Sequence, residues 1–229
     1  MSAVAPPLKT ALIAVLAMAG VGVGVAVITG DNTGTENAYL RMIAADDTTS
    51  PAVKAGMVMA AYYESSFRVR LTPYVDRVGK GQPLTVCNGI TDAGLPRAFP
   101  RIDPAKVYTL DECYAIERLL FVGYDKRMSS YVPSYRAQTI WQQAAQLDFV
   151  HHFGWGAFAA STMRAKANAG DAAGACAEHA KWKWTTLPSG AKTVLAGLET
   201  RAKSNAEICG WPAPPQAAVI FLDGLEVLA

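Results

Sequence analysis

The feature that most constrains this chain of 229 residues is an uncharged stretch near its start, ALIAVLAMAGVGVGVAVITG, from Ala11 to Gly30. A helix of that length, at a rise of about 1.5 Å per residue, is long enough to cross the core of a bilayer. Lys9 precedes the stretch and Asp31 follows it, so the positive-inside rule predicts a cytoplasmic N-terminus and an exported remainder. Its glycines weaken the helix, and we therefore predict a weakly held transmembrane segment at residues 11–30.

A cleavable signal peptide is the alternative interpretation of the same stretch, with Ala17–Ala19 as its small-residue cleavage site. The apolar run continues well beyond that point, and a single lysine precedes it, which favours an uncleaved anchor. Both alternatives export residues 31–229. We therefore divide the start of the chain into an anchor segment at residues 1–30 and a polar linker at residues 31–49.

The composition fits one exported globular domain. Hydrophobic residues make up 51% of the chain, which is enough for a substantial core, and the net charge of +2 gives no nucleic-acid signature. The cysteines all follow the anchor and form no CxxC pair, so two disulfides are expected rather than a zinc site, with three pairings possible. They are Cys87, Cys113, Cys176 and Cys209.

Local patterns after residue 49 predict an α+β domain. Ser50 and Pro51 have the chemistry of a helix start, and the apolar spacing that follows predicts a helix up to Glu64. Residues 66–100 change to β-forming residues, glycines and prolines, with LTPYVD and PLTVCNG as candidate strands. Helices are predicted over 108–128, 134–154, 161–169, 171–181 and 193–208, whereas the apolar tail over 213–229 is not placed.

Three polar side chains around these strands have the chemistry of glycosidic hydrolysis. Glu64 follows the apolar run MVMAAYY, so burial is expected to raise its pKa and keep it protonated, as a general acid requires. Asp76 lies in a polar, turn-rich stretch and is expected to stay ionised, where it could orient or deprotonate a water. Thr85 offers a hydroxyl that could hold the same water. Taken alone, a carboxylate at a helix end and another in a turn are ordinary features.

A family resemblance gives these residues more weight. The segment RLTPYVD, a glycine turn and LTVCNGIT resemble the T4-type phage lysozyme family, glycoside hydrolase family 24. The family pattern is Glu, then Arg-Leu-x-x-Tyr-x-Asp, a Gly turn and Thr-Ile-Gly-Tyr-Gly-His-Thr. The resemblance implies a lysozyme-like fold with a small β lobe and a larger helical lobe. It also implies a muramidase in which Glu64 is the general acid, while Asp76 and Thr85 position the attacking water.

The resemblance continues into the C-terminal half and covers about residues 50–212, the predicted catalytic domain. FVHHFGWGAFAASTMRAKANAGD and VLAGLETRAKSNAEIC are similar to helical blocks of the family. By position it implies that Tyr74, Asn88 and His152 bind substrate. By the packing of the family's helices it implies the disulfides Cys87–Cys113 and Cys176–Cys209.

The sequence also departs from the family pattern. The gaps from Glu64 to Asp76 and from Asp76 to Thr85 are each three residues longer, which hairpin loops can absorb. The Gly after the catalytic Glu is Ser65 here, and Gly-Tyr-Gly-His is Cys87-Asn88-Gly89-Ile90. His151 and His152 are adjacent on a helix and point about 100° apart, so no metal site or other cofactor is predicted.

A weak N-terminal span on such a domain is similar to the signal-anchor-release endolysins of phages of Gram-negative bacteria. This implies export by the host secretion machinery, attachment to the host inner membrane through residues 11–30, and release into the periplasm as an active monomer. The substrate implied is the β-1,4 bond between N-acetylmuramic acid and N-acetylglucosamine of peptidoglycan strands, cut for host-cell lysis. Two alternatives stay open. They are a lytic transglycosylase that uses Glu64 alone, and a non-catalytic, membrane-tethered peptidoglycan-binding protein.

Overall fold

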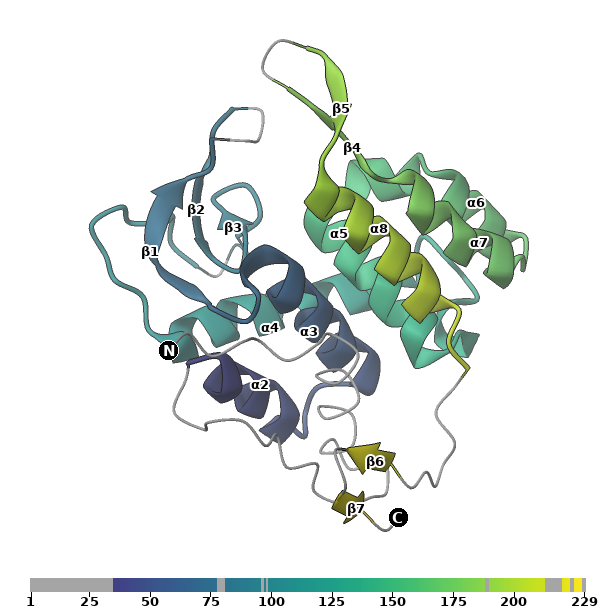
Figure 1. Cartoon of the computed structure of the whole chain (residues 1–229), viewed down its shortest axis with the longest axis horizontal. Coiled ribbons are helices and arrows are strands. Elements are labelled where there is room, and N and C mark those ends of the chain that lie inside the picture. The colour runs from purple at the N-terminus through teal and green to yellow at the C-terminus, as the bar shows by residue number, and fades with distance from the viewer. Residues whose placement is uncertain are drawn as a thin grey trace.

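The computed structural model describes residues 35–77, 81–95, 97, 99–187, 190–212, 220–222 and 225–227. Helix α3 (Pro51–Ser65) lies between two parts of the molecule (Figure 1). A three-stranded sheet lies on one side of it, and a group of helices from the second half of the chain lies on the other. This is the predicted α+β arrangement of a small β lobe and a larger helical lobe.

Helix α2 (Thr35–Ala45) corrects the predicted linker. Tyr39, Leu40 and Ile43 are fully buried in the core, because apolar residues at this spacing form one face of a helix. The folded domain therefore begins well before residue 50. The last three residues of the polar run that suggested a linker, Thr35, Glu36 and Asn37, form the first turn of this helix.

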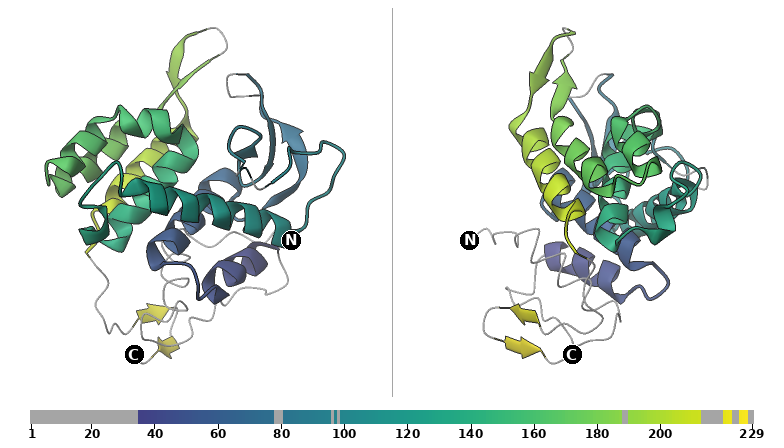
Figure 2. Two further views of the ribbon diagram at one scale, coloured as in Figure 1. Left: turned by 180° about the vertical axis from the view of Figure 1, so that it is seen from behind. Right: turned by 90° about the vertical axis from the view of Figure 1, so that its right-hand side faces the viewer.

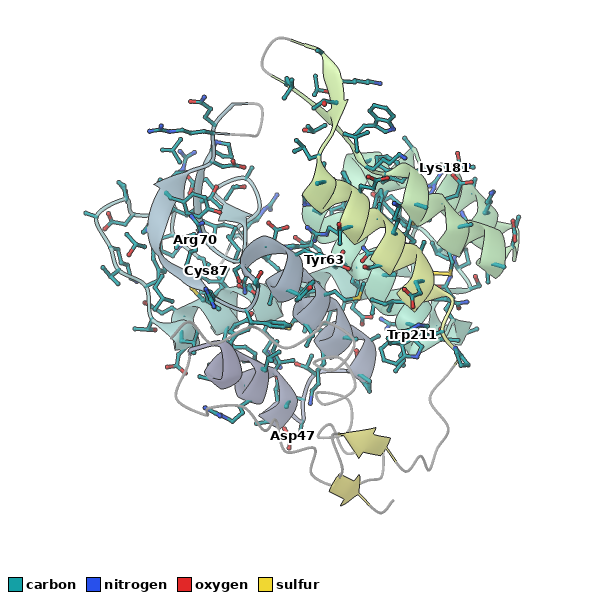
Figure 3. All side chains as sticks on the ribbon, in the orientation of Figure 1. Asp47, Tyr63, Arg70, Cys87, Lys181 and Trp211 are labelled. Carbon is teal, nitrogen blue, oxygen red and sulfur yellow. A yellow bond between two sulfur atoms is a disulfide. The ribbon has the colours of Figure 1, made fainter. Side chains whose placement is uncertain are left out.

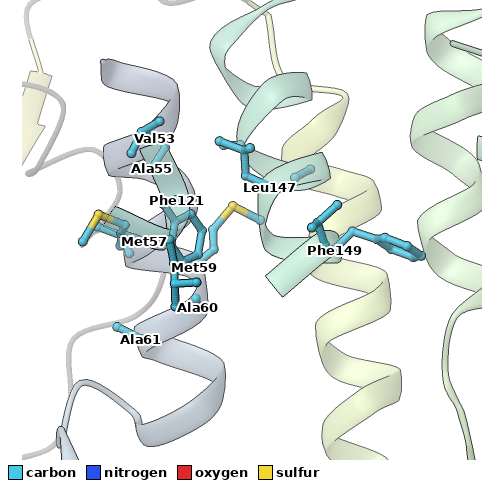
Figure 4. Close-up of a cluster of buried hydrophobic side chains, with 14 of the residues drawn as sticks. Val53, Ala55, Met57, Met59, Ala60, Ala61, Phe121, Leu147 and Phe149 are labelled. Carbon is cyan, nitrogen blue, oxygen red and sulfur yellow. The ribbon is translucent and has the colours of Figure 1, made fainter. Parts of the chain in front are cut away.

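Helix α3 begins as the sequence predicts. The Ser50 side chain accepts a hydrogen bond from the backbone N–H of Val53, with Pro51 at the first helical position. Residues 52–61 are buried on every side of the helix, since α3 is enclosed by both lobes, whereas its last turn is partly exposed. At Gly56 a Cβ atom would lie 3.2 Å from Leu147 Cβ of α5 (Ile140–Ala159) and 3.2 Å from Phe121 Cε1 of α4 (Leu110–Met128), so this glycine permits close packing. Figure 4 shows the neighbouring core side chains of these three helices.

The β lobe is an antiparallel sheet of β1 (Arg70–Val75), β2 (Leu84–Cys87) and β3 (Ile90–Thr91), in that order. Tyr74 pairs with Thr85, and Val86 pairs with Ile90. A disulfide between Cys87 and Cys113 fastens β2 to the long helix α4, which crosses behind α3 in the view of Figure 1 (Figure 2). The candidate strands of the sequence analysis are thus confirmed.

The helical half follows the predicted order, with changed boundaries. The Thr109–Glu112 capping box is present at the start of α4. The predicted helix end at Gly154 is confirmed, because Gly154 breaks the helical backbone with φ +79°, and a second helical segment follows it within α5. The elements are α4 (Leu110–Met128), η1 (Tyr135–Ala137), α5 (Ile140–Ala159), α6 (Thr162–Asn168), α7 (Ala172–Glu178), η2 (His179–Lys181), β4 (Trp184–Thr186), β5 (Lys192–Val194) and α8 (Ala196–Cys209).

The hairpin of β4 and β5 is a second correction, since the sequence analysis placed a helix from residue 193 onward. Its register pairs Thr185 with Thr193, and β-branched residues favour this extended pairing. The hairpin and the β1–β2 strands extend from the same side of the molecule (Figures 1 and 2). A second disulfide, Cys176–Cys209, joins α7 to the end of α8, and both disulfides have the pairing that the family resemblance implied.

The two ends of the chain add little to the described fold. The tail contributes a short antiparallel hairpin of β6 (Ile220–Leu222) and β7 (Leu225–Val227). Among the described helices, none combines the length and apolar character needed to cross a bilayer. The predicted span at residues 11–30 lies outside the described residues.

Candidate active site

Glu64 lies in the last turn of α3, where the chain leaves the helix for the sheet. Ser66 caps the helix in the left-handed conformation with φ 51°, and Phe67 follows with φ 64°. Consecutive non-glycine residues in this region carry strain, which the full burial of Phe67 beside the ring of Tyr62 offsets. This sharp exit points the end of α3, with Glu64, toward both the β2–β3 turn and helix α8.

A buried charge network holds the Glu64 carboxylate. Arg201 of α8 donates from NH1 to Glu64 Oε1 at 2.5 Å. The same guanidinium donates from Nε and NH2 to the two oxygens of Asp148 on α5, at 3.1 and 2.6 Å. Asn205 also donates to Asp148, and the guanidinium lies over the ring of Tyr63, which Figure 3 labels beside α8. Helices α3, α5 and α8 therefore meet at this one arginine.

These charges reverse the predicted ionisation of Glu64. Burial, the largest single influence, raises the pKa as the sequence analysis expected. The hydrogen bond to His152 and the positive charge of Arg201 lower it further than burial raises it, so the pKa of Glu64 lies well below its usual range. The prediction of a protonated resting carboxyl is therefore wrong, because His152 of α5 and Arg201 of α8 lie beside it.

The turn between β2 and β3 packs directly against the Glu64 carboxylate. Gly89 occupies the turn with φ +77°, a conformation that side chains rarely adopt. A Cβ atom at Gly89 would lie 2.8 Å from Glu64 Oε2 and 3.0 Å from Cδ. Glycine is needed here for two independent reasons, the backbone conformation and the close approach of the carboxylate.

Replacing Gly89 by alanine is expected to lower peptidoglycan-cleaving activity at least 10-fold, because the new methyl group displaces the Glu64 carboxylate. The matched control is Gly170→Ala, since Gly170 has φ +79° and no atom within 4 Å of an added Cβ. Both variants should lose about 1 kcal/mol of stability from backbone strain. Equal activity loss in the two variants, after correction for folded fraction, would contradict the contact with Glu64.

Asn88 does not have the substrate-binding position that the family resemblance implied. Its side chain is fully buried, with Nδ2 donating to Glu117 Oε2 at 3.0 Å and Oδ1 accepting from the Ser65 hydroxyl at 2.6 Å. Its backbone N–H donates to Glu117 Oε1 at 3.2 Å. All these groups of Asn88 form hydrogen bonds inside the protein, so Asn88 stabilises the β2–β3 turn and does not bind a sugar.

Thr85, Asp76 and Tyr74 lie together near the connection between β1 and β2, where Tyr74 pairs with Thr85. Thr85 is 3% exposed, and its hydroxyl donates to the Pro83 carbonyl at 3.1 Å, which also accepts from the Asp76 backbone N–H at 3.0 Å. Burial raises the pKa of Tyr74, and the nearby carboxylates of Glu64 and Asp76 raise it further while Arg70 lowers it. Tyr74 thus lies within the electrostatic reach of both carboxylates.

The adjacent histidines of α5 have separate roles. His152, partly exposed, places Nδ1 3.2 Å from Glu64 Oε1 and 2.9 Å from NH1 of Arg201. His151 places Nε2 3.1 Å from the carbonyl oxygen of Asn88, and burial lowers its pKa, so the ring is neutral and donates this bond. In the described part of the chain, no three His, Cys, Asp or Glu side chains gather where they could bind one metal ion.

Comparison with known proteins decides the family. The family model described as phage lysozyme matches residues 65–205. The chain belongs to the phage lysozyme family. It is 33% identical over 143 residues to the SAR-endolysin of Bacteriophage PS119, a match that covers 62% of this chain and 75% of that protein. The SAR-endolysin of Enterobacteria phage P21 is 30% identical over 143 residues, with 62% and 76% covered. These relatives place the chain among the peptidoglycan-degrading endolysins of the SAR type.

Solved structures show the same lysozyme fold at low sequence identity. The muramidase domain of SpmX from Asticaccaulis excentricus matches with a TM-score of 0.56 and 19% identity, over 69% of this chain and 96% of that one. The active form of the P1 phage endolysin Lyz matches with a TM-score of 0.56 and 13% identity, over 76% and 92%. The two-lobed arrangement around α3 is therefore the fold of this lysozyme.

Sequence reasoning missed three charged residues of the lysozyme site. Arg201 occupies the arginine position of the block VLAGLETR, but no role was predicted for it. Asp148 and Glu117 are single carboxylates within apolar helical runs, AAQLDFV and AIERLLF. An isolated carboxylate on an apolar helix face is seldom buried without a partner, and that signal could have identified both residues.

Proposed function

We propose that this endolysin is a muramidase that hydrolyses the β-1,4 bond between N-acetylmuramic acid and N-acetylglucosamine in peptidoglycan. Glu64 is the general acid, and Asp76 positions the attacking water from the edge of the sheet. The observation that carries the proposal is the position of Glu64, a partly exposed carboxylate at the junction of α3, α8 and the β2–β3 turn. Tyr74, within reach of both carboxylates, and His152 are the proposed sugar-contacting side chains.

The ionised resting state of Glu64 requires that the acid gain a proton before it donates one. A glycan strand over the carboxyl removes its remaining contact with water, and this desolvation favours the protonated form. His152 is partly exposed and lies 3.2 Å from Glu64 Oε1, so it is the side chain placed to carry a proton from solvent. The protonated Glu64 then donates to the glycosidic oxygen as the bond breaks.

A lytic transglycosylase is the second candidate, and Thr85 gives it support. Because the Thr85 hydroxyl donates to the Pro83 carbonyl, its proton is engaged and only its lone pairs could hold a water. A reaction without an attacking water would use Glu64 and the muramyl 6-hydroxyl instead.

Analysis of the products separates these reactions. We expect digestion of purified peptidoglycan to release reducing N-acetylmuramic acid ends, and Asp76→Ala to lower the rate by roughly 100-fold, because the water loses its orienting carboxylate. Thr85→Val, which keeps the shape of the side chain, serves as the comparison variant. Anhydromuramic ends, with Asp76→Ala as active as the unchanged protein, would identify the transglycosylase.

The export route is part of the same proposal. Residues 1–30 are proposed to form a weak signal anchor, exported by the host secretion machinery with the N-terminus in the cytoplasm. Residues 35–212 form the catalytic domain, extended at its start from the predicted residue 50, and residues 213–229 form a tail. Release from the inner membrane gives an active, monomeric periplasmic enzyme, and a tethered chain is held inactive by displacement of Glu64 relative to Asp76.

Fractionation of expressing cells tests the anchor. We expect the chain first in the inner membrane and later, at unchanged mass, in the periplasm, because a span with several glycines is only weakly held by lipid. Replacing Gly20, Gly22 and Gly24 by leucine should retain the chain in the membrane and delay lysis. A shortened periplasmic chain would instead indicate a cleaved signal peptide.

A further inference from the structure

Glu117 is a fully buried carboxyl group at the centre of the domain, outside the proposed catalytic set. It lies on α4 and accepts a short hydrogen bond from the Tyr39 hydroxyl of α2. It also accepts from the Asn88 backbone N–H at 3.2 Å and from Asn88 Nδ2 at 3.0 Å. A buried carboxyl of this kind costs free energy unless its neighbours satisfy it, and here three donors do so.

The two oxygen atoms of Asn88 accept hydrogen bonds from residues close to Glu64. The Ser65 hydroxyl donates to Asn88 Oδ1, and the His151 ring donates to the Asn88 carbonyl. Ser65 and Asn88 are two of the positions at which this chain departs from the family motif, and the structure shows that they bond to each other. Glu117 accepts from the two donor groups of Asn88, its backbone N–H and Nδ2.

The Asn88–Gly89 turn transmits this arrangement to the catalytic carboxylate. Gly89 directly follows Asn88, and its missing side chain leaves room for Glu64 Oε2, which would lie 2.8 Å from a Cβ atom there. A small shift of Asn88 therefore moves Gly89, against which the Glu64 carboxylate packs. A misplacement of about 1 Å at such a group can cost roughly 100-fold in rate.

We propose that Glu117 is a positioning residue, whose buried carboxyl group holds the Asn88–Gly89 turn under Glu64 and thereby sets the geometry of the glycosidic cleavage. The inference rests on the proposed role of Glu64 as the general acid. The ionised form of Glu117 holds the turn best, because a protonated carboxyl has one acceptor position fewer for its three donors.

The ionisation of Glu117 changes near neutral pH, which provides a readout. Burial raises its pKa to about 7, although the hydrogen bonds from Tyr39 and Asn88 oppose the shift. The groups that face it are Tyr39 from α2 and Glu64 from α3, and neutral His151 from α5 reaches the same turn. We therefore expect kcat to decrease as the pH falls through this range.

The decisive experiment compares kcat, KM and thermal unfolding of the full chain from pH 5 to 9, with purified peptidoglycan as substrate. Glu117→Gln should lower kcat at least 10-fold, leave KM within about twofold, and abolish the pH step that is assigned to Glu117. The exchanged pair Glu117→Gln with Asn88→Asp should recover kcat to within about threefold, since it restores donors and acceptors in reversed roles. Unchanged kcat in Glu117→Gln, or no recovery in the pair, would overturn the proposal.

Tyr39→Phe keeps the proposal testable if Glu117→Gln does not fold. Removing the Tyr39 hydroxyl takes away a hydrogen bond that lowers the pKa of Glu117, so the step in kcat should move to higher pH. If Tyr39, Glu117 and Asn88 only stabilised the fold, the pH at which kcat changes would not move.

Glu64→Gln, assayed in parallel, separates the two levels of inference. An active Glu64→Gln would remove the proposed function, together with everything that rests on it. An inactive Glu64→Gln beside a fully active Glu117→Gln would remove only the positioning role.

Discussion

Replacing Glu64 by glutamine is expected to lower kcat on peptidoglycan by about 1,000-fold, within the range ascribed to general acid catalysis. Glutamine has the shape of glutamate, and its carbonyl oxygen can still accept from Arg201, which lies 2.5 Å from Glu64 Oε1. The fold should therefore survive, and the loss should be chemical. The measurement is the initial rate of release of soluble fragments, with the unfolding midpoint recorded on the same sample.

The matched control is Glu207→Gln on the exposed surface of α8. It removes a carboxylate of the same chemistry from the same domain, away from the α3 terminus. We expect it to keep full activity. Residual activity of Glu64→Gln above about one tenth of the unchanged rate would mean that another group supplies the proton.

Replacing Arg201 by methionine is expected to destabilise the domain by about 3 to 5 kcal/mol, because it leaves the Asp148 carboxylate buried without its cation. Asp148 is completely buried, and Arg201 is its only charged partner among the described residues. Methionine retains much of the apolar stem of arginine, so the loss reports mainly the charge. The measurement is denaturant unfolding near neutral pH.

The double variant Arg201→Met with Asp148→Asn is the control for this interpretation. Asparagine removes the unpaired charge but keeps an oxygen for the Asn205 side chain, which donates to Asp148 at 2.5 Å. Most of the lost stability should return. A double variant as unstable as Arg201→Met alone would show that packing of the guanidinium, rather than charge pairing, is what matters.

The single variant Arg201→Met also tests the ionisation of Glu64. Because the folded-state pKa of Glu64 is depressed, the stabilisation from its ion pair is present above the unfolded carboxyl pKa and is lost as the pH falls toward the folded value. The part of the destabilisation that comes from this pair should therefore shrink in acid. Without the positive charge of Arg201 the pKa of Glu64 should rise, so the alkaline limit of activity should move to higher pH.

Local features of the fold could be read from the sequence because they depend on neighbouring residues. Ser50 and Thr109 cap their helices as predicted, since a cap needs only the side chain and the first turn. The strands around Tyr74 and Thr85 also follow from local β preference. The hairpin at residues 184–194 was missed, because its short strands lie next to a helical stretch and carry no strong alternation of polar and apolar residues.

Glu64 shows where local reasoning stops. Its apolar neighbours in the chain predicted a protonated carboxyl, and burial does raise its pKa. The side chains that reverse the outcome are His152 and Arg201, which are 88 and 137 positions away in the sequence. No pattern around Glu64 contains that information.

The sequence by itself determined the family, the order of helices α3 to α7 with β1 and β2 between α3 and α4, and the residue types available for catalysis. Motifs and helix or strand periods are properties of adjacent residues. Tertiary structure alone decided that Glu64 rests ionised, and that Asn88 supports the turn instead of binding sugar. It also decided that Glu117 bonds to Asn88, the residue that precedes Gly89. Coulomb and desolvation energies depend on distance and burial in space, and only the packing of α2, α3, α4, α5 and α8 sets those quantities.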